Sequence, residues 1–189
     1  LDSTTTGGFN TALGTFAGES NTTGQYNTYG GYNAGDYATT GSNNTSFGAF
    51  AGQQNVTGGS NTNFGYNAGG ATTSSYNVMV GMNAGDTNTG GAGNICIGYA
   101  SDVHTASANY AIALGYGCIS VGSQYFTFGT GGGNDRVYNQ FSANASWTRV
   151  SDQRYKKEIV ENADCGLLFI NDLRPVTFKW KAKSEIDAD

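Results

Sequence analysis

A nine-residue phrase, Asn-Thr-x-apolar-Gly-x-x-Ala-Gly, recurs along this sequence at intervals of 16 or 17 residues. A unit this short cannot bury an apolar face by itself, whereas stacked units can. The repeat therefore predicts a solenoid in which equivalent residues lie above one another. The central glycines of the seven copies, of which the last two are degraded, are Gly14, Gly31, Gly48, Gly65, Gly81, Gly98 and Gly115.

Apolar and small residues occupy fixed columns around the central glycine. The residue before it is apolar in six of seven copies, and the residue three after it is always small. These positions and the residue just after the glycine differ by two, so an extended chain would place them on one face. We expect this face to be the buried one. The column before the glycine is Leu13, Gly30, Phe47, Phe64, Val80, Ile97 and Leu114, and the small column is Ala17, Ala34, Ala51, Ala68, Ala84, Ser101 and Cys118.

An asparagine stands four residues before the glycine in the first six copies. Stacked asparagines can form a ladder of side-chain amides along a solenoid, so this column needs no catalytic explanation. The stretches between the phrases are rich in Gly, Asn, Asp and Thr, which is typical of turns. We therefore predict an all-β fold, a β-roll or β-helix with 17-residue rungs. The asparagine column is Asn10, Asn27, Asn44, Asn61, Asn77 and Asn94.

Charge and glycine content divide the chain. Residues 1–131 contain no Lys or Arg, and 29 of the 30 glycines precede Asn134. We predict a repeat rod over 1–122, a β-rich neck or tip over 123–150 and a different module over 151–189. The net charge of −5 argues against nucleic acid and anionic lipid as partners. No apolar run reaches the roughly 18 residues of a membrane-spanning helix, so no membrane insertion is expected.

Few residues offer catalytic or metal-binding chemistry. His104 is the only histidine, which excludes a Ser-His-Asp triad and most zinc sites, and we expect neither a metal nor another cofactor. Cys96, Cys118 and Cys165 are widely spaced, and we interpret them as packing residues rather than as a disulfide framework.

The repeated phrase with its Gly-rich turns resembles the head repeats of trimeric autotransporter adhesins and the β-helical shafts of phage tail fibres. The resemblance is one of type, because the adhesin repeat is shorter. It implies a homotrimer whose rods pack side by side. A narrow coil buries little surface within one chain, which also favours oligomerisation.

A second motif begins at residue 151. The run Ser151-Asp152-Gln153-Arg154-Tyr155-Lys156, preceded by Trp147 and followed by GLLFINDLRPVTFKW, is similar to the start of the endosialidase-type intramolecular chaperone. Residues 151–189 correspond to the N-terminal part of such a domain, and a short helix between Asp164 and Pro175 and a strand over 176–180 would make it a small α+β fragment. The resemblance implies a Ser–Lys endopeptidase that cleaves its own chain after the chaperone has assembled the trimer. It carries over Ser151 as the nucleophile, Lys156 as the base and Ser151–Asp152 as the cleaved bond.

Together these features predict a trimeric phage tail fibre or spike that attaches to a host surface. Its location would be the virion, after synthesis in the host cytoplasm. A host cell-surface receptor, with a glycan as the first expectation, would contact the turns or the tip. The candidate contacts there are Tyr37, Gln53, Gln54 and Tyr125.

Two other functions fit the same repeat. A bacterial trimeric surface adhesin built from these modules would lie at the bacterial cell surface. An ice-binding rod would need an exposed, flat array of threonines, and the file Thr11, Thr28, Thr45 and Thr62 would stack. That file shares a face with the apolar column, so we expect it to point inward.

Overall fold

The computed structural model describes residues 2–131, 135–141 and 148–149. The chain divides into two compact units, Leu1–Ser151 and Asp152–Asp189, and all described residues belong to the first. These residues form strands and turns, with no helix among them. The strands are β1 (Thr11–Leu13), β2 (Thr28–Gly30), β3 (Thr45–Phe47), β4 (Thr62–Phe64), β5 (Val78–Val80), β6 (Ile95–Ile97), β7 (Ile112–Leu114), β8 (Tyr125–Gly129), β9 (Arg136–Gln140) and β10 (Thr148–Arg149).

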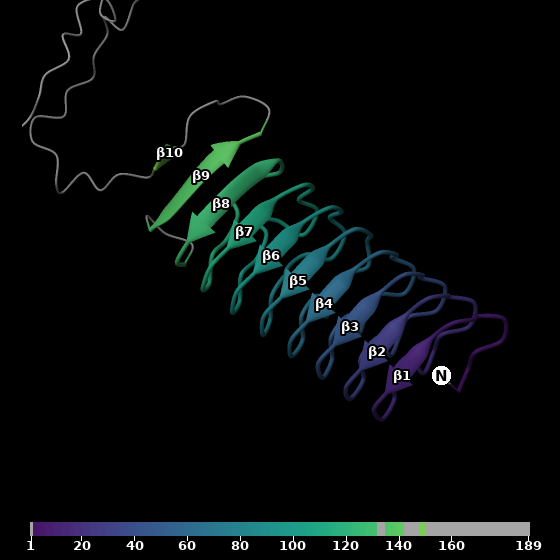
Figure 1. The fold of residues 1–189 in the computed structure, drawn as a ribbon. Coiled ribbons are helices and arrows are strands. Elements are labelled where there is room, and N and C mark those ends of the chain that lie inside the picture. Colours follow the sequence, from purple (N-terminus) through teal and green to yellow (C-terminus); the bar gives the residue numbers. More distant parts are fainter. Residues whose placement is uncertain (1, 132–134, 142–147, 150–189) are drawn as a thin grey trace, which may run out of the picture. The chain divides into compact units, whose positions relative to one another are not determined.

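The strands lie in chain order in one sheet, and β1 to β8 are parallel (Figure 1). Equivalent residues pair across coils, as Thr28 does with Thr45 and Thr45 with Thr62. The predicted β-solenoid of about seven 17-residue rungs is therefore confirmed. The last coil is shorter, because Ile112 pairs with Phe126. Strands β9 and β10 then extend the sheet in antiparallel fashion.

Each strand from β1 to β7 is three residues long, and from β2 onward its middle residue points into the solenoid. The prediction for the small column is confirmed, because all seven of its members are buried. The prediction for the column before the glycine is wrong, because Leu13, Phe47, Phe64 and Ile97 are exposed. The inward middle residues are Tyr29, Ser46, Asn63, Met79, Cys96, Ala113 and, in β8, Thr127.

The central glycine explains this error. Its φ lies between +124° and +137° in all seven copies, a conformation that residues with a Cβ atom rarely adopt. The chain turns there, so the alternation of an extended strand does not continue across the glycine. A Cβ atom on Gly48 would also lie 2.4 Å from the carbonyl oxygen of Gly65 in the next coil. The central glycines thus form a column, which we call the glycine spine, along which the backbones of consecutive coils approach closely.

A second glycine column accommodates the large inward side chains. A Cβ atom on Gly35 would lie 2.2 Å from the ring of Tyr29, and one on Gly85 would lie 2.2 Å from the sulfur of Met79. In the next two coils the inward residues, Cys96 and Ala113, are smaller. There the glycine is replaced by Asp102 and Ile119, which pair in a parallel bridge. The large inward residues Tyr29 and Met79 are therefore each matched to a glycine, whereas a coil with a smaller inward residue can carry a side chain there.

The asparagine ladder is confirmed, but its partners are mostly backbone atoms. The side-chain oxygen of Asn44 accepts a hydrogen bond from the backbone N–H of Asn61 at 3.0 Å. The Asn44 amide nitrogen donates to the carbonyl oxygen of Gly58 at 2.8 Å. The same oxygen-to-N–H contact recurs from Asn10 to Asn94. Each asparagine therefore ties two coils together where the strand begins.

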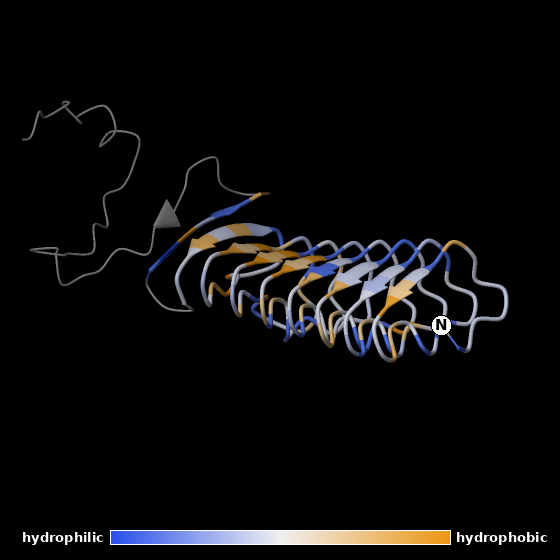
Figure 2. Cartoon of the chain, turned by 60° about the horizontal axis from the view of Figure 1, so that its bottom comes forward, coloured by the Kyte–Doolittle hydropathy of each residue, from blue (hydrophilic) through white to orange (hydrophobic). Residues whose placement is uncertain are grey.

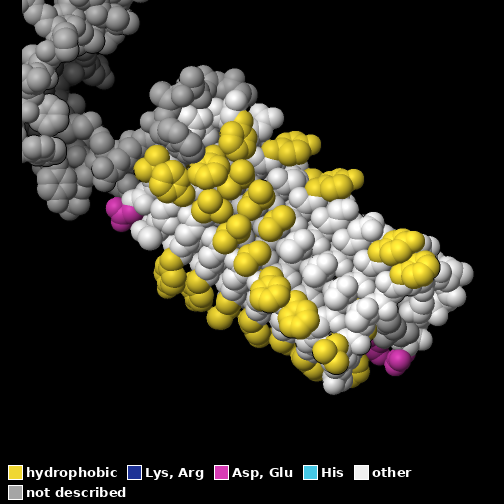
Figure 3. Space-filling model, viewed as in Figure 1, with side chains coloured by type: hydrophobic (Ala, Val, Ile, Leu, Met, Phe, Trp, Pro, Cys, Tyr) yellow, Lys and Arg dark blue, Asp and Glu magenta, His cyan; other side chains and the backbone are white. Residues whose placement is uncertain are grey.

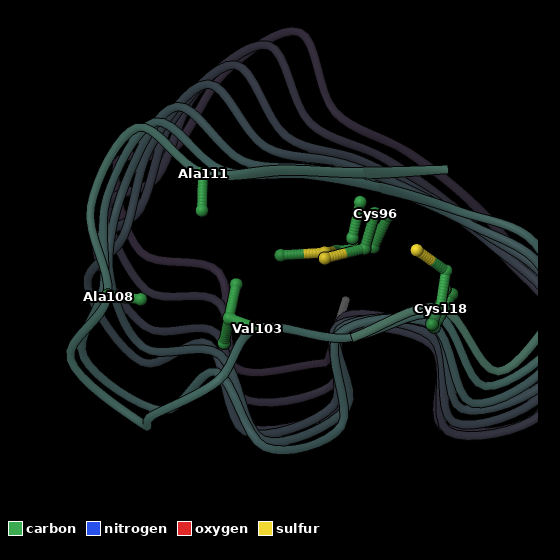
Figure 4. Close-up of a cluster of buried hydrophobic side chains, with 9 residues drawn as sticks. Cys96, Val103, Ala108, Ala111 and Cys118 are labelled. Atoms are coloured by element: carbon green, nitrogen blue, oxygen red, sulfur yellow. The ribbon is translucent and has the colours of Figure 1, made fainter. Parts of the chain in front are cut away.

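Buried apolar side chains fill the later coils. Cys96 comes from the strand wall and Cys118 from the opposite wall, and both point into the interior together with Val103 and Ala111 (Figure 4). Both cysteines are free and fully buried, so their interpretation as packing residues is confirmed. Burial raises the pKa of both thiols, which keeps them protonated.

Candidate functional site

The outer face of the stacked parallel strands, which we call the strand face, consists of the first and third residues of β1 to β7 and of their partners Phe126 and Phe128 in β8. It is apolar over β5 to β8, where hydrophobic side chains gather in the surface view (Figures 2 and 3). Ile97 is 41% and Phe128 43% exposed. Soluble monomers rarely leave large contiguous apolar patches uncovered, so this face is a candidate interface. Its apolar members are Val78, Val80, Ile95, Ile97, Ile112, Leu114, Phe126 and Phe128.

A row of aromatic residues, which we call the aromatic file, borders the strand face just beyond the glycine spine. In the early coils its members stand alternately two residues and one residue after the central glycine, and the rings of neighbouring coils are in contact. Phe16 and Tyr32 lie 6.0 Å apart, Tyr32 and Phe50 5.4 Å, and Phe50 and Tyr66 5.6 Å, all edge to face. The file is Phe16, Tyr32, Phe50, Tyr66, Met82, Tyr99 and Tyr116, all aromatic except Met82.

Neither surface carries a charge. Residues 2–131 contain no Lys or Arg, and four of their five acids follow the spine glycine by four or five residues, in the next turn. These four are Glu19, Asp36, Asp86 and Asp102. Asp102 is partly buried, and this burial raises the pKa of its carboxyl, although its oxygens accept hydrogen bonds from the backbone N–H groups of Thr87 and Val103.

A second aromatic edge lies at the amino ends of the strands. Phe9, Tyr26, Tyr76 and Tyr110 have φ values of 59°, 58°, 65° and 55°, a left-handed conformation that is costly for bulky residues. The Phe9 and Tyr26 rings stack at 5.0 Å, yet all four side chains are mainly exposed. Burial therefore does not offset the strain. The same positive φ recurs at Asn43, Ser60 and Gly93 in the other coils, so it belongs to the backbone of the repeat.

The structure places three of the four proposed receptor contacts together. The backbone N–H of exposed Tyr37 donates to the carbonyl oxygen of Gln53 in the next coil at 3.0 Å, and Gln54 follows directly. Tyr125 lies apart from them on β8, where its hydroxyl donates to Gln140 at 3.1 Å. Nothing in this placement tests whether any of the four contacts a receptor, so they stay predictions.

The threonine file points outward, contrary to the prediction. Thr11, Thr28, Thr45 and Thr62 are all exposed, since the first residue of each strand shares the outer face with the third. The file is one residue wide, and Phe47 and Phe64 stand beside it on the same face. Their rings stack at 5.7 Å, which interrupts any flat array of hydroxyls.

The proposed dyad of Ser151 and Lys156 lies outside the described residues, as do Asp152, Cys165 and the expected helix. In the part of the chain that is described, no three His, Cys, Asp or Glu side chains gather to hold a metal ion. That part also contains no helix able to cross a membrane.

Comparison with known families points to the same C-terminal segment as the sequence motif. Residues 151–189 match the family model described as the chaperone of endosialidase. No curated protein and no solved structure matches the chain significantly. The chain thus combines a β-solenoid with a segment similar to the endosialidase chaperone.

Proposed function

We propose that this chain is part of a trimeric phage tail fibre or spike that attaches to a host surface. The observation that carries the proposal is the chaperone-like segment at 151–189 directly after a β-solenoid. Chaperones of this family are associated with phage tail proteins, which supports a virion location. The segment would drive folding of the trimer and then leave by self-cleavage.

Cleavage would use Ser151 and Lys156. A serine hydroxyl is a weak nucleophile, and a lysine can accept its proton only if burial or a neighbouring cation lowers the lysine pKa. The hydroxyl oxygen would attack the carbonyl carbon of the Ser151–Asp152 bond, Lys156 would pass the hydroxyl proton to the nitrogen of Asp152, and this nitrogen would leave as an amine. Water would then hydrolyse the resulting ester, so that residues 1–151 remain as the mature fibre.

Attachment would use the turns or the amino-end aromatic edge. Tyr37 and Gln54 lie in adjacent coils, and Tyr76 and Tyr110 are exposed in strained conformations. Aromatic rings beside amides offer the stacking and hydrogen bonding that a glycan needs. We expect Tyr37→Ala and Tyr76→Ala to weaken binding to host-surface glycans, measured on a glycan array, while the solenoid stays folded.

Mass spectrometry of the intact chain tests the chaperone. We expect the wild-type chain to shorten to residues 1–151, and Ser151→Ala and Lys156→Ala to stay whole. Ser184→Ala, a serine substitution in the same segment, is the matched control and should shorten like the wild type. A Ser151→Ala chain that still loses residues 152–189 would contradict the proposed dyad.

The exposed threonine file is the specific observation that keeps ice binding as a second candidate. Thermal hysteresis distinguishes the two, because an ice-binding rod would lower the freezing point and lose this activity in Thr45→Leu. We expect no hysteresis, since the file is narrow and flanked by phenylalanines. The bacterial surface adhesin would differ from the fibre in its location. Labelling this chain on intact virions and on whole bacteria distinguishes the two functions.

A further inference from the structure

We infer that the strand face over β5 to β8, together with the aromatic file, is the contact between copies of this chain. The inference rests on the proposed function only in taking the assembly to be a trimer. The strand face and the aromatic file meet along the glycine spine and form one continuous apolar strip. Val80, Ile97 and Leu114 lie on one side of the spine, and Tyr99 and Tyr116 lie on the other. Tyr99 and Tyr116 stack at 4.9 Å.

The absence of charge on this strip indicates which partner binds it. The strip has no Lys, Arg, Asp or Glu, although the chain has a net charge of −5. A partner selected by charge, such as a nucleic acid or a sulfated or sialylated glycan, finds no counter-ion on it. A second copy fits, because two neutral strips can meet while the acids remain in the turns beyond the buried alanine column.

The spacing of the strip gives the same answer. Its side chains repeat once per coil, and the coils are about 4.8 Å apart. A surface with ridges at that interval matches a neighbour with the same interval, in parallel and without a shift. Another copy of the solenoid has that spacing along its whole length.

An interface of sufficient area requires both the strand face and the aromatic file. Over β5 to β8, four strands about 4.8 Å apart and three residues wide give a strand face of roughly 200 Å². A stable interface buries about 800 Å² per partner. The strand face alone therefore falls short, and the contact must extend over the aromatic file along its border. In a closed ring of three, one copy can offer the strand face where its neighbour offers the file.

The apolar part of the strand face lies over the later coils. Thr11, Thr28, Thr45 and Thr62 open β1 to β4, whereas Val78, Ile95 and Ile112 open β5 to β7. Contact between copies should therefore be tightest from β5 onward.

A charge placed on the strip tests the assignment. Ile97→Asp places a carboxylate against the apolar file of the neighbouring copy, and we expect the trimer to dissociate at a protein concentration at least tenfold higher than the wild type does, measured by native mass spectrometry and sedimentation. Val56→Asp is the matched control, because Val56 is also β-branched and is 40% exposed against 41% for Ile97, but lies in a turn away from the strip. It should leave the trimer intact.

A second measurement needs no variant. Hydroxyl-radical labelling of the wild-type assembly should protect Tyr99 and leave Tyr76, which is 70% exposed at the amino-end edge, fully labelled. If the trimer persists in Ile97→Asp, or if Tyr99 is labelled as heavily as Tyr76, the proposed interface is wrong, although the protein is still a trimer. A monomeric wild type overturns both the interface and the trimer. Shortening at Ser151, read in the same samples, then shows whether the chaperone part of the proposed function holds.

Discussion

The early coils, β2 to β4, and the later coils, β5 to β7, have the same backbone but different side chains. Inside, the early coils carry Tyr29, Ser46 and Asn63, whereas the later ones carry Met79, Cys96 and Ala113. Outside, threonines give way to valine and isoleucine (Figure 2). The fold therefore does not depend on an apolar interior in every coil. What both halves share is the glycine spine and the asparagine ladder.

The spine should be the most sensitive shared element. Gly48→Ala in the early half and Gly98→Ala in the later half each force a positive φ on alanine and place its Cβ atom 2.4 Å from the next coil's carbonyl oxygen. We expect each to lower the free energy of unfolding by about 5 kcal/mol or more. Urea denaturation followed by circular dichroism measures this.

The control is Gly90→Ala, because a Cβ atom there meets nothing within 4 Å and its φ is not positive. That variant should stay within about 1 kcal/mol of the wild type. If Gly48→Ala proved as mild as Gly90→Ala, the spine would not be the common support of the two halves.

The ladder should come next, with equal effects in both halves. Asn27→Ala would leave the N–H of Asn44 and the carbonyl of Gly41 without their partner, and Asn94→Ala would do the same to Ala111 and Ala108. Each unsatisfied buried group costs about 1–3 kcal/mol, so we expect a loss of about 4 kcal/mol in either half. Urea denaturation of the two variants, with exposed Gln25→Ala as the control, checks this. A large difference between the two asparagine variants would mean that the halves are held by different forces.

Much of this architecture could be predicted from the sequence. The 17-residue period predicted the parallel stack, and the Asn column and the column of small residues predicted the ladder and one buried wall, because each position has a single chemical requirement. The inward strand column was missed because it varies, from Tyr29 through Asn63 to Ala113. Its signal was the pairing of size with the second glycine column, Tyr29 with Gly35 and Met79 with Gly85.

The outward direction of the apolar column could not be read from spacing alone. Ile97 and Ser101 lie four residues apart and would share a face in a continuous strand, but Gly98 has a φ of 130° and turns the chain between them. An apolar column also has two possible causes, an interior or an interface between chains. One chain's sequence does not distinguish them, and the proposed dyad at Ser151 and Lys156 has no described geometry to compare.

The interiors of the two halves should differ in their response to truncation. Met79→Ala removes a fully buried side chain, and we expect a loss of about 3 kcal/mol. Ser46→Ala removes only the hydroxyl that accepts a hydrogen bond from Asn63 at 3.2 Å, and we expect about 1 kcal/mol. Thermal and urea unfolding of both variants measures the contrast. Equal losses would show that polar and apolar interiors contribute alike.

The interiors of the two halves should also differ in how stability depends on pH. Burial raises the pKa of the Cys96 thiol in the later half above its ordinary value of 9.0 and that of the Tyr29 hydroxyl in the early half above 10.0. The unfolded chain ionises first, so each contribution is complete below the ordinary pKa and is lost as pH rises toward the folded pKa. We expect stability to fall by about 1.4 kcal/mol per pH unit for each group, from pH 9 through Cys96 and from pH 10 through Tyr29 as well. Cys96→Ala should reduce the slope from pH 9 onward and Tyr29→Phe only above pH 10, measured by thermal unfolding. If Cys96→Ala had the same slope of stability against pH as the wild type, the interior of the later coils would admit water. The contrast between the two halves would then lie only on their outer faces.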